Sequence, residues 1–202
     1  GRGPTGSVVS AVAGRPDPVS ALKARVGDGN VTLSWTPSTH DGGSPILDYR
    51  IEYSVDDGSS WGVVDGEVGT STTATVYGLR NGTEYQFSVA AVTEIGMSGT
   101  TSVAAVPATI PDQATSLMAV GEVDGLVFRW RRPSDGGSAI TRILVDLAVV
   151  GSEGWKTYEA GPATTTARIG GLVTGSEYLV RVTYENGIGA GEPSDAVRVL
   201  IR

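Results

Sequence analysis

Short runs in which apolar and polar residues alternate recur along the whole chain. Val31, Leu33 and Trp35, for example, alternate with Thr32 and Ser34. Similar alternation occurs in residues 49–53, 85–91, 126–130, 143–147 and 178–184. A period of two places successive side chains on opposite faces of a β-strand, so that one face is buried and the other meets water. The pattern predicts antiparallel sheets packed in two layers, and no stretch shows a helical period of comparable strength.

The chain also repeats itself at an offset of 93 to 95 residues. The matched positions are Trp35 and Trp130, Trp61 and Trp155, Leu79 and Leu172, Tyr85 and Tyr178, and the Asp-Gly-Gly-Ser runs 41–44 and 135–138. A self-similar unit of this length is close to the roughly 100 residues of an immunoglobulin-type sandwich. The repeat therefore predicts two domains, at residues 15–108 and 109–202.

Residues 1–14 also resemble part of a repeat. Ser10-Ala11-Val12 aligns with Ala104-Ala105-Val106, in each case shortly before a Pro-Asp pair. We expect residues 1–14 to form the last strand of a preceding, truncated domain, and the alternative is a disordered tail. Such a strand would expose unpaired backbone groups and could pair with an edge strand of another molecule.

The strand positions carry a recognisable set of residues. A Trp that ends the second strand, a Tyr in the third, and a Leu followed six residues later by a Tyr resemble the fibronectin type III pattern. The residues concerned are Trp35, Tyr49, Leu79, Tyr85, Trp130, Leu172 and Tyr178. The resemblance implies an all-β chain of two tandem seven-stranded immunoglobulin-like sandwiches, with these residues as structural core. Ile143 departs from the pattern, which usually has Tyr there, and we expect one weaker core contact.

Composition excludes several classes of site. The chain has no Cys, which removes Cys nucleophiles and thiolate zinc sites and leaves the cores to stabilise the domains alone. Its net charge is −7, of which residues 15–108 carry −6, and this argues against nucleic-acid binding. No apolar run is long enough for direct membrane insertion.

A chain without Cys fits the cytosol or a bacterial exported protein. The Gly-rich turns, which resemble bacterial extracellular versions of the family, favour the second.

Residues suited to catalysis or metal binding are few. His40 is the single histidine and lies in a polar loop, so a hydrolytic triad has only this residue to use. The segment 54–61 resembles the Asp-box hairpin, in which an Asp bonds backbone amides as a structural turn. Asp56 and Asp57 in that segment are weak alternative candidates for a metal site, although an EF-hand needs a longer ligand series. We predict no enzyme activity and no cofactor.

Two groups of residues are candidates for binding. Arg129, Arg131 and Arg132 flank Trp130 and could meet an acidic partner surface; the alternative is a solvated strand face paired with Asp146 or Glu177. The second group occupies the loops that join the last two strands of each repeat, with Ile95 and Met97 in the first and Ile188 in the second. These apolar residues either bind a partner or pack against the neighbouring domain.

The family resemblance implies a non-catalytic, extracellular or cell-surface array that binds a protein or glycan, as part of a longer exported protein. Tandem domains of this family also occur in cytokine receptors, which leaves adhesion to a host protein or cytokine as one form of this function. The competing interpretation is a passive spacer that holds a kinase, sensor or glycoside hydrolase domain away from the cell surface. An apolar surface patch would favour binding, and an evenly polar surface would favour spacing.

Overall fold

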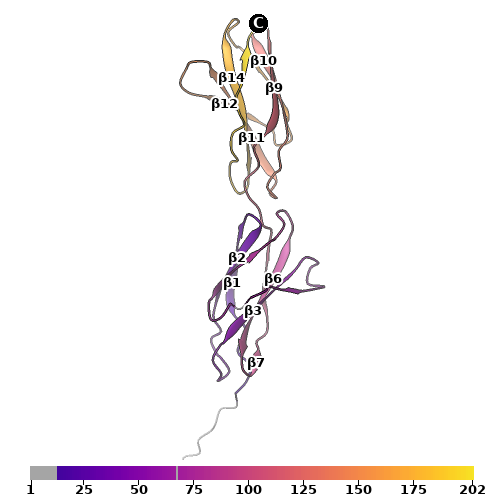
Figure 1. The fold of residues 1–202 in the computed structure, drawn as a ribbon, viewed down its shortest axis with the longest axis vertical. Helices are drawn as coiled ribbons and strands as arrows, with labels where there is room; N and C mark the ends of the chain where they lie inside the picture. The colour runs from indigo at the N-terminus through magenta and orange to yellow at the C-terminus, as the bar shows by residue number, and fades with distance from the viewer. Residues whose placement is uncertain (1–12, 67) are drawn as a thin grey trace, which may run out of the picture. The chain divides into compact units, whose positions relative to one another are not determined.

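The computed structural model describes residues 13–66 and 68–202. The chain divides between Pro107 and Ala108 into two compact units, which we call unit 1 and unit 2 (Figure 1). Every regular element among the described residues is a β-strand, which confirms the all-β prediction. In this part of the chain no helix has the length and apolar character needed to span a lipid bilayer.

Unit 1 contains two antiparallel sheets. The first has the strand order β1 (Ser20–Gly27), β2 (Asn30–Thr36) and β5 (Thr73–Tyr77). The second is formed by β4 (Gly62–Val63), β3 (Asp48–Ser54), β6 (Tyr85–Thr93), β7 (Gly96–Met97) and β8 (Thr101–Ala105). β6 is central in the second sheet, because it pairs with β3 along one edge and with β7 and β8 along the other.

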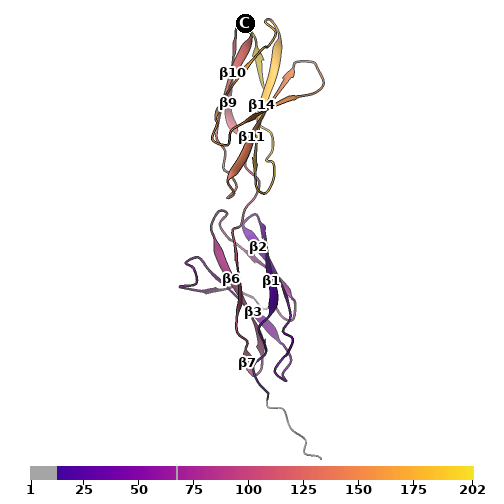
Figure 2. The same ribbon diagram turned by 180° about the vertical axis from the view of Figure 1, so that it is seen from behind.

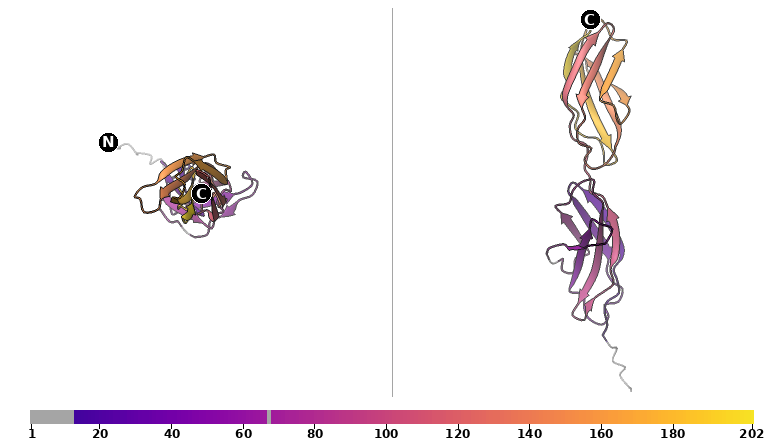
Figure 3. Two further views of the ribbon diagram at one scale, coloured as in Figure 1. Left: turned by 90° about the horizontal axis from the view of Figure 1, so that it is seen from above. Right: turned by 90° about the vertical axis from the view of Figure 1, so that its right-hand side faces the viewer.

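Unit 2 repeats this arrangement. Its first sheet has the order β13 (Thr166–Gly170), β10 (Gly125–Arg131) and β9 (Thr115–Glu122). Its second sheet has the order β12 (Lys156–Ala160), β11 (Ile140–Val149), β14 (Glu177–Asn186) and β15 (Val197–Leu200). The views in Figures 2 and 3 allow the strands of both sheets to be followed in each unit.

Each unit buries alternate side chains from both sheets in its own core. The buried cluster of unit 1 includes Leu33, Trp35, Tyr49, Ile51, Leu79, Tyr85, Phe87 and Val89. The cluster of unit 2 includes Leu126, Phe128, Trp130, Ile143, Val145, Tyr178, Val180 and Val182, with Leu172 packed against it. The tyrosines Tyr85 and Tyr178 each accept a hydrogen bond from a backbone N–H five residues upstream, at 3.0 and 3.1 Å. These bonds join a strand to the preceding loop in the manner of a tyrosine corner.

The two cores take their second aromatic ring from different strands. In unit 1, Tyr49 of β3 lies opposite Ala91 of β6, and its ring meets the Trp35 ring edge-on at 5.1 Å. In unit 2 the corresponding cross-strand pair is Ile143 of β11 and Tyr184 of β14. The expectation that Ile143 simply weakens the core is therefore incomplete. Ile143 is fully buried, and Tyr184 brings an aromatic ring into the core from the neighbouring strand.

The two Asp-Gly-Gly turns hold the segments by which the chain enters each unit. The Gly14 N–H donates to the Gly42 carbonyl at 2.8 Å, and the Thr109 N–H donates to the Gly136 carbonyl at 2.9 Å. Gly42 and Gly136 both have a φ of 71°, and a Cβ atom at either would overlap a carbonyl oxygen of the entering segment. Glycine is required at these positions by both the backbone conformation and the close approach.

Residues 1–12, which make up most of the strand expected at residues 1–14, lie outside the described residues. Ala13 and Gly14 are described and belong to no strand.

Candidate functional site

The candidate binding loops expose apolar side chains, and their backbone N–H groups are hydrogen-bonded to side chains of the same loop. Ile95 and Met97 in unit 1 are 48% and 41% exposed, and Ile188 in unit 2 is 47% exposed. The Thr93 hydroxyl accepts from the Ile95 N–H at 3.3 Å, and the Asn186 side-chain oxygen accepts from the Ile188 N–H at 2.8 Å. In both loops these hydrogen bonds therefore help to fix the backbone that carries the exposed apolar side chains.

The three candidate arginines differ in the contacts that their side chains make. Arg129 and Arg131 are exposed on β10, on the face opposite the buried Trp130. The Arg132 guanidinium donates to the Pro162 carbonyl at 2.8 Å, which commits one side of that group to the neighbouring loop. Arg129 and Arg131 take part in none of the ion pairs that the described residues form.

The predicted pairing of these arginines with Asp146 or Glu177 is wrong. Asp146 pairs instead with Arg181 at 3.0 Å, and Glu177 pairs with Arg198 at 3.5 Å. Asp146 and Glu177 lie on the other sheet of unit 2, so the sandwich separates them from Arg129. The Arg181 guanidinium also lies over the Trp155 ring, 4.2 Å from its centroid, which favours the charged group by a cation–π contact.

The structure adds three residues to this face that the sequence interpretation missed. Met118 and Val120 of β9 are 67% and 56% exposed, and Arg168 of β13 lies on the same side of the sheet. Met118 and Val120 belong to an apolar stretch in which either face could have been the buried one. A comparison with Lys23 and Arg25, the matching positions of the first repeat, would have pointed to them.

Asp56 forms the centre of a bonded turn. Its carboxylate accepts from the Ser60 hydroxyl at 2.6 Å, from the Ser54 hydroxyl at 2.7 Å and from the Ser60 N–H at 2.9 Å. These bonds, the Ser60 hydroxyl first, lower the pKa of Asp56 from its ordinary value to about 2. Trp61 completes the turn by donating to the Gly58 carbonyl at 3.1 Å. Asp56 therefore has a structural use, and the described residues contain no cluster of three His, Cys, Asp or Glu side chains suited to a metal ion.

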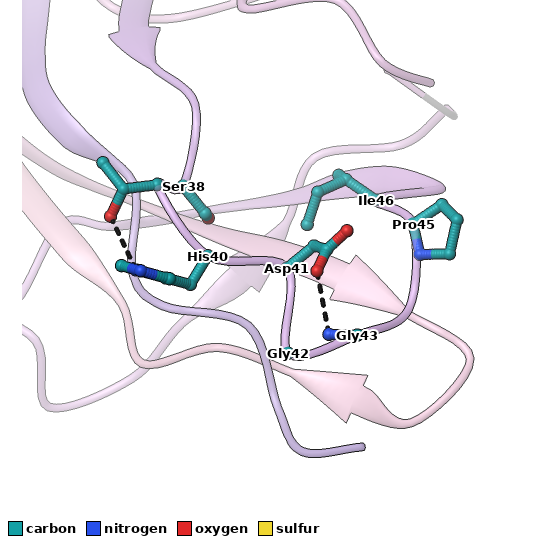
Figure 4. Close-up of a pocket in the computed structure, with 8 residues that line it drawn as sticks. Ser38, His40, Asp41, Gly42, Gly43, Pro45 and Ile46 are labelled. Atoms are coloured by element: carbon teal, nitrogen blue, oxygen red, sulfur yellow. Dashed lines mark hydrogen bonds between the residues drawn. The ribbon is translucent and has the colours of Figure 1, made fainter. Parts of the chain in front are cut away.

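His40 lies in an exposed loop beside an open depression (Figure 4). Its Nδ1 atom is 3.0 Å from the Asp17 carboxylate and 3.2 Å from the Thr39 hydroxyl. The Asp41 carboxylate, also at the depression, accepts from the Gly43 N–H at 2.8 Å. Both side chains are thus engaged in hydrogen bonds, and Figure 4 shows the bond between the Asp41 carboxylate and the Gly43 N–H.

A known family model matches the sequence of each of the two sandwiches, which are centred on Trp35 and Trp130. The model of the fibronectin type III domain matches residues 17–106 and again residues 112–199. The chain belongs to the fibronectin type III family. One domain of this family thus falls in unit 1 and one in unit 2, and the predicted tandem fibronectin type III fold is confirmed.

Relatives of similar sequence are much longer than this chain. M-protein of striated muscle from Gallus gallus is 30% identical over 179 residues, which covers 82% of this chain and 12% of M-protein. The slow-type myosin-binding protein C of Homo sapiens is 31% identical over 202 residues, which covers 88% of this chain and 18% of that protein. A two-domain segment of chicken tenascin superposes with a TM-score of 0.48 at 17% identity, covering 89% of this chain and 97% of the segment.

These relatives correct two earlier expectations. M-protein of striated muscle and myosin-binding protein C point away from an extracellular or cell-surface location, and the prediction of such a location is wrong. Both are animal proteins, and the resemblance to bacterial members of the family is unsupported. The relatives are consistent with a protein partner and lend no support to a glycan ligand.

Proposed function

We propose that this chain is a non-catalytic, protein-binding segment of a longer protein, built from fibronectin type III domains at residues 15–108 and 109–202. The observation that carries the proposal is the 31% identity with myosin-binding protein C, which extends over 88% of the chain and therefore over both units. Neither that protein nor M-protein is named as an enzyme.

The use of polar side chains supports this function. Of the residues best suited to chemistry by type, Asp56 bonds within its own turn, and His40 bonds to Thr39 and to Asp17 of the entering segment. The exposed apolar side chains Ile95, Met97 and Ile188 are instead available to a partner, and large apolar groups at a rigid loop tip are suited to a protein contact.

Co-sedimentation tests the proposal with the intact 202-residue chain. Purified filaments of striated-muscle myosin are mixed with the chain and pelleted, with an unrelated soluble protein as control. We expect saturable binding that falls when Ile95, Met97 and Ile188 are replaced by Ser. A chain that stays in the supernatant at every concentration contradicts binding to this filament. Binding unchanged by the Ser variant moves the contact away from the loop tips.

A second candidate function, that of a spacer between other domains, is favoured for unit 1. The outer face of its β1–β2–β5 sheet carries Lys23, Arg25, Thr32 and Ser34, and the Thr32 hydroxyl bonds that of Thr75 at 2.9 Å. Tyr77 of β5, which is 76% exposed, also lies on this face, but the polar positions around it gain little from covering by a partner. Under this division of roles unit 1 provides length, and unit 2 provides the contact.

A further inference from the structure

The outer face of the β13–β10–β9 sheet in unit 2 combines apolar side chains with arginines. The pairing of the strands aligns Val120, Val127 and Arg168 in one row across the sheet. The next row contains Met118 and Arg129. We call these five residues, together with Arg131, the Arg–apolar face. The residues between them on β10 are Phe128 and Trp130, which point into the core and are buried.

The same positions of unit 1 provide an internal reference. Strand pairing there puts Lys23 beside Ser34 and Arg25 beside Thr32, as Met118 lies beside Arg129 and Val120 beside Val127 in unit 2. The corresponding residues are the pairs Lys23 and Met118, Arg25 and Val120, Thr32 and Val127, and Ser34 and Arg129. Unit 1 folds as the same sandwich with polar residues at these sites. The sandwich therefore does not require Met118, Val120 or Val127 to be apolar.

The charges on the Arg–apolar face are largely uncompensated. Glu122 forms an ion pair with Arg168 at one edge of the face. Arg129 and Arg131 are exposed and belong to no ion pair of the described residues. Unit 2 as a whole is acidic, since residues 109–202 carry a net charge of −2. The face is therefore a local concentration of positive charge around an apolar centre.

We propose that the Arg–apolar face binds an acidic protein surface that has apolar side chains at its centre. Guanidinium groups pair well with carboxylates, because their planar donors match two carboxylate oxygens at once. Apolar side chains on the partner would remove Met118, Val120 and Val127 from water. A nucleic-acid backbone presents negative charge without such an apolar centre, and the net charge of −7 repels it. Two copies of this chain repel each other by the same charge.

This inference rests on the proposed protein-binding function and specifies one surface for it. The first measurement uses the intact isotope-labelled chain and a synthetic peptide in which glutamates are interspersed with leucines. Two control peptides replace the glutamates by Gln or the leucines by Ser. We expect the amide signals of Met118, Val120, Val127 and Arg129 to shift with the acidic apolar peptide and less with either control. Signals that stay in place, or shift only on unit 1, overturn the proposal.

A graft from unit 1 supplies the matched variant. Met118→Lys, Val120→Arg and Val127→Thr together give unit 2 the residues that its counterpart already tolerates, so the fold is preserved and is checked by signal dispersion. The graft also adds two positive charges, so the affinity is measured at about 0.5 M salt, which screens them. We expect the affinity for the peptide to fall about tenfold or more under these conditions, as for loss of an apolar interface centre. The reciprocal graft, Lys23→Met with Arg25→Val and Thr32→Val, leaves Ser34 in place of arginine and should gain little. Equal affinity of the wild type and the unit 2 graft overturns the proposal.

Two further outcomes separate this surface from the broader function. If the wild type co-sediments with myosin but does not bind the acidic apolar peptide, the protein-binding function stands and the proposal for the Arg–apolar face fails. If the wild type sediments as a dimer at equilibrium and the graft is a monomer, the occupant is a second copy and the proposed partner is wrong. Loss of peptide binding in the graft, with the fold intact, supports the proposal.

Discussion

The two units differ in the strand that brings an aromatic ring to the side of the core where β3 pairs with β6 and β11 pairs with β14. In unit 1 the ring comes from β3, and in unit 2 it comes from β14. Unit 1 places Tyr49 beside the central Trp35, and the Trp35 Nε1 atom is buried without a hydrogen-bond partner among the described residues. Unit 2 places Tyr184 on the neighbouring strand, and its hydroxyl accepts from Trp130 Nε1 at 2.7 Å. Burial of Tyr184 raises the pKa of its hydroxyl above the ordinary value. The volume of an aromatic ring can thus be moved between strands, whereas the hydrogen bond exists only in one arrangement.

The largest expected effect is the loss of either central ring. Trp35→Ala and Trp130→Ala should each destabilise their unit by about 3–5 kcal/mol, because a large buried ring leaves a cavity. Trp130→Ala should cost about 1 kcal/mol more, since it also removes a hydrogen bond. Chemical denaturation of the whole chain, with signals assigned to each unit, gives the two values. If Trp35→Ala lost as much unfolding free energy as Trp130→Ala or more, the hydrogen bond of Trp130 would not distinguish the two units.

The next effect isolates the hydroxyl of Tyr184. Tyr184→Phe keeps the ring but leaves Trp130 Nε1 buried without a partner, which should destabilise unit 2 by about 1–3 kcal/mol. Tyr49→Phe is the matched control in unit 1. The Tyr49 hydroxyl makes no hydrogen bond within the described part of the chain, so we expect a loss of less than about 1 kcal/mol. A similar loss of unfolding free energy in both variants would show that the hydrogen bond between Trp130 and Tyr184 does not stabilise unit 2.

The tyrosine corners should respond alike, because the two units share this feature. Tyr85→Phe removes the bond from the Arg80 N–H, and Tyr178→Phe removes the bond from the Val173 N–H. Each should cost about 1 kcal/mol, the typical net value of a hydrogen bond. Thermal unfolding of the two variants measures this, and a clear difference between them would mean that the units diverge beyond their central rings.

The smallest effect is confined to the Asp56 turn and to low pH. The folded pKa of Asp56, about 2, is lower than the value of about 3.9 expected in the unfolded chain. Its carboxylate therefore stabilises the turn above about pH 4, and this contribution is lost as the pH falls through about 2. The amide signal of Ser60 should titrate with a midpoint near pH 2 and should not titrate in Asp56→Asn. The turn of unit 2, with Ser152 and Glu153, lacks this carboxylate and provides the reference. A Ser60 midpoint near pH 4 would contradict the bonded turn.

Features set by local chemistry could be predicted from the sequence. Alternation over Val31–Trp35 and Leu126–Trp130 predicted strands with a buried Trp, since a period of two decides which side chains share a face. The Asp56 turn was also predicted as a hairpin, because its bonds join residues within four positions of each other. The two Asp-Gly-Gly turns revealed the repeat, although their contact with the entering segment required the structure.

Features that depend on strand pairing were decided only by the tertiary structure. Asp146 and Arg129 are close in sequence, yet they lie on different sheets, and only the strand order shows that Asp146 meets Arg181. Tyr184 replaces the ring missing at Ile143 because β11 and β14 bring residues 41 positions apart side by side. Met118 and Val120 lie in an apolar stretch, and their exposure follows from the register of β9 against β10. A pattern along one strand fixes which residues share a face, but the neighbouring strands determine which face is buried and what each side chain meets.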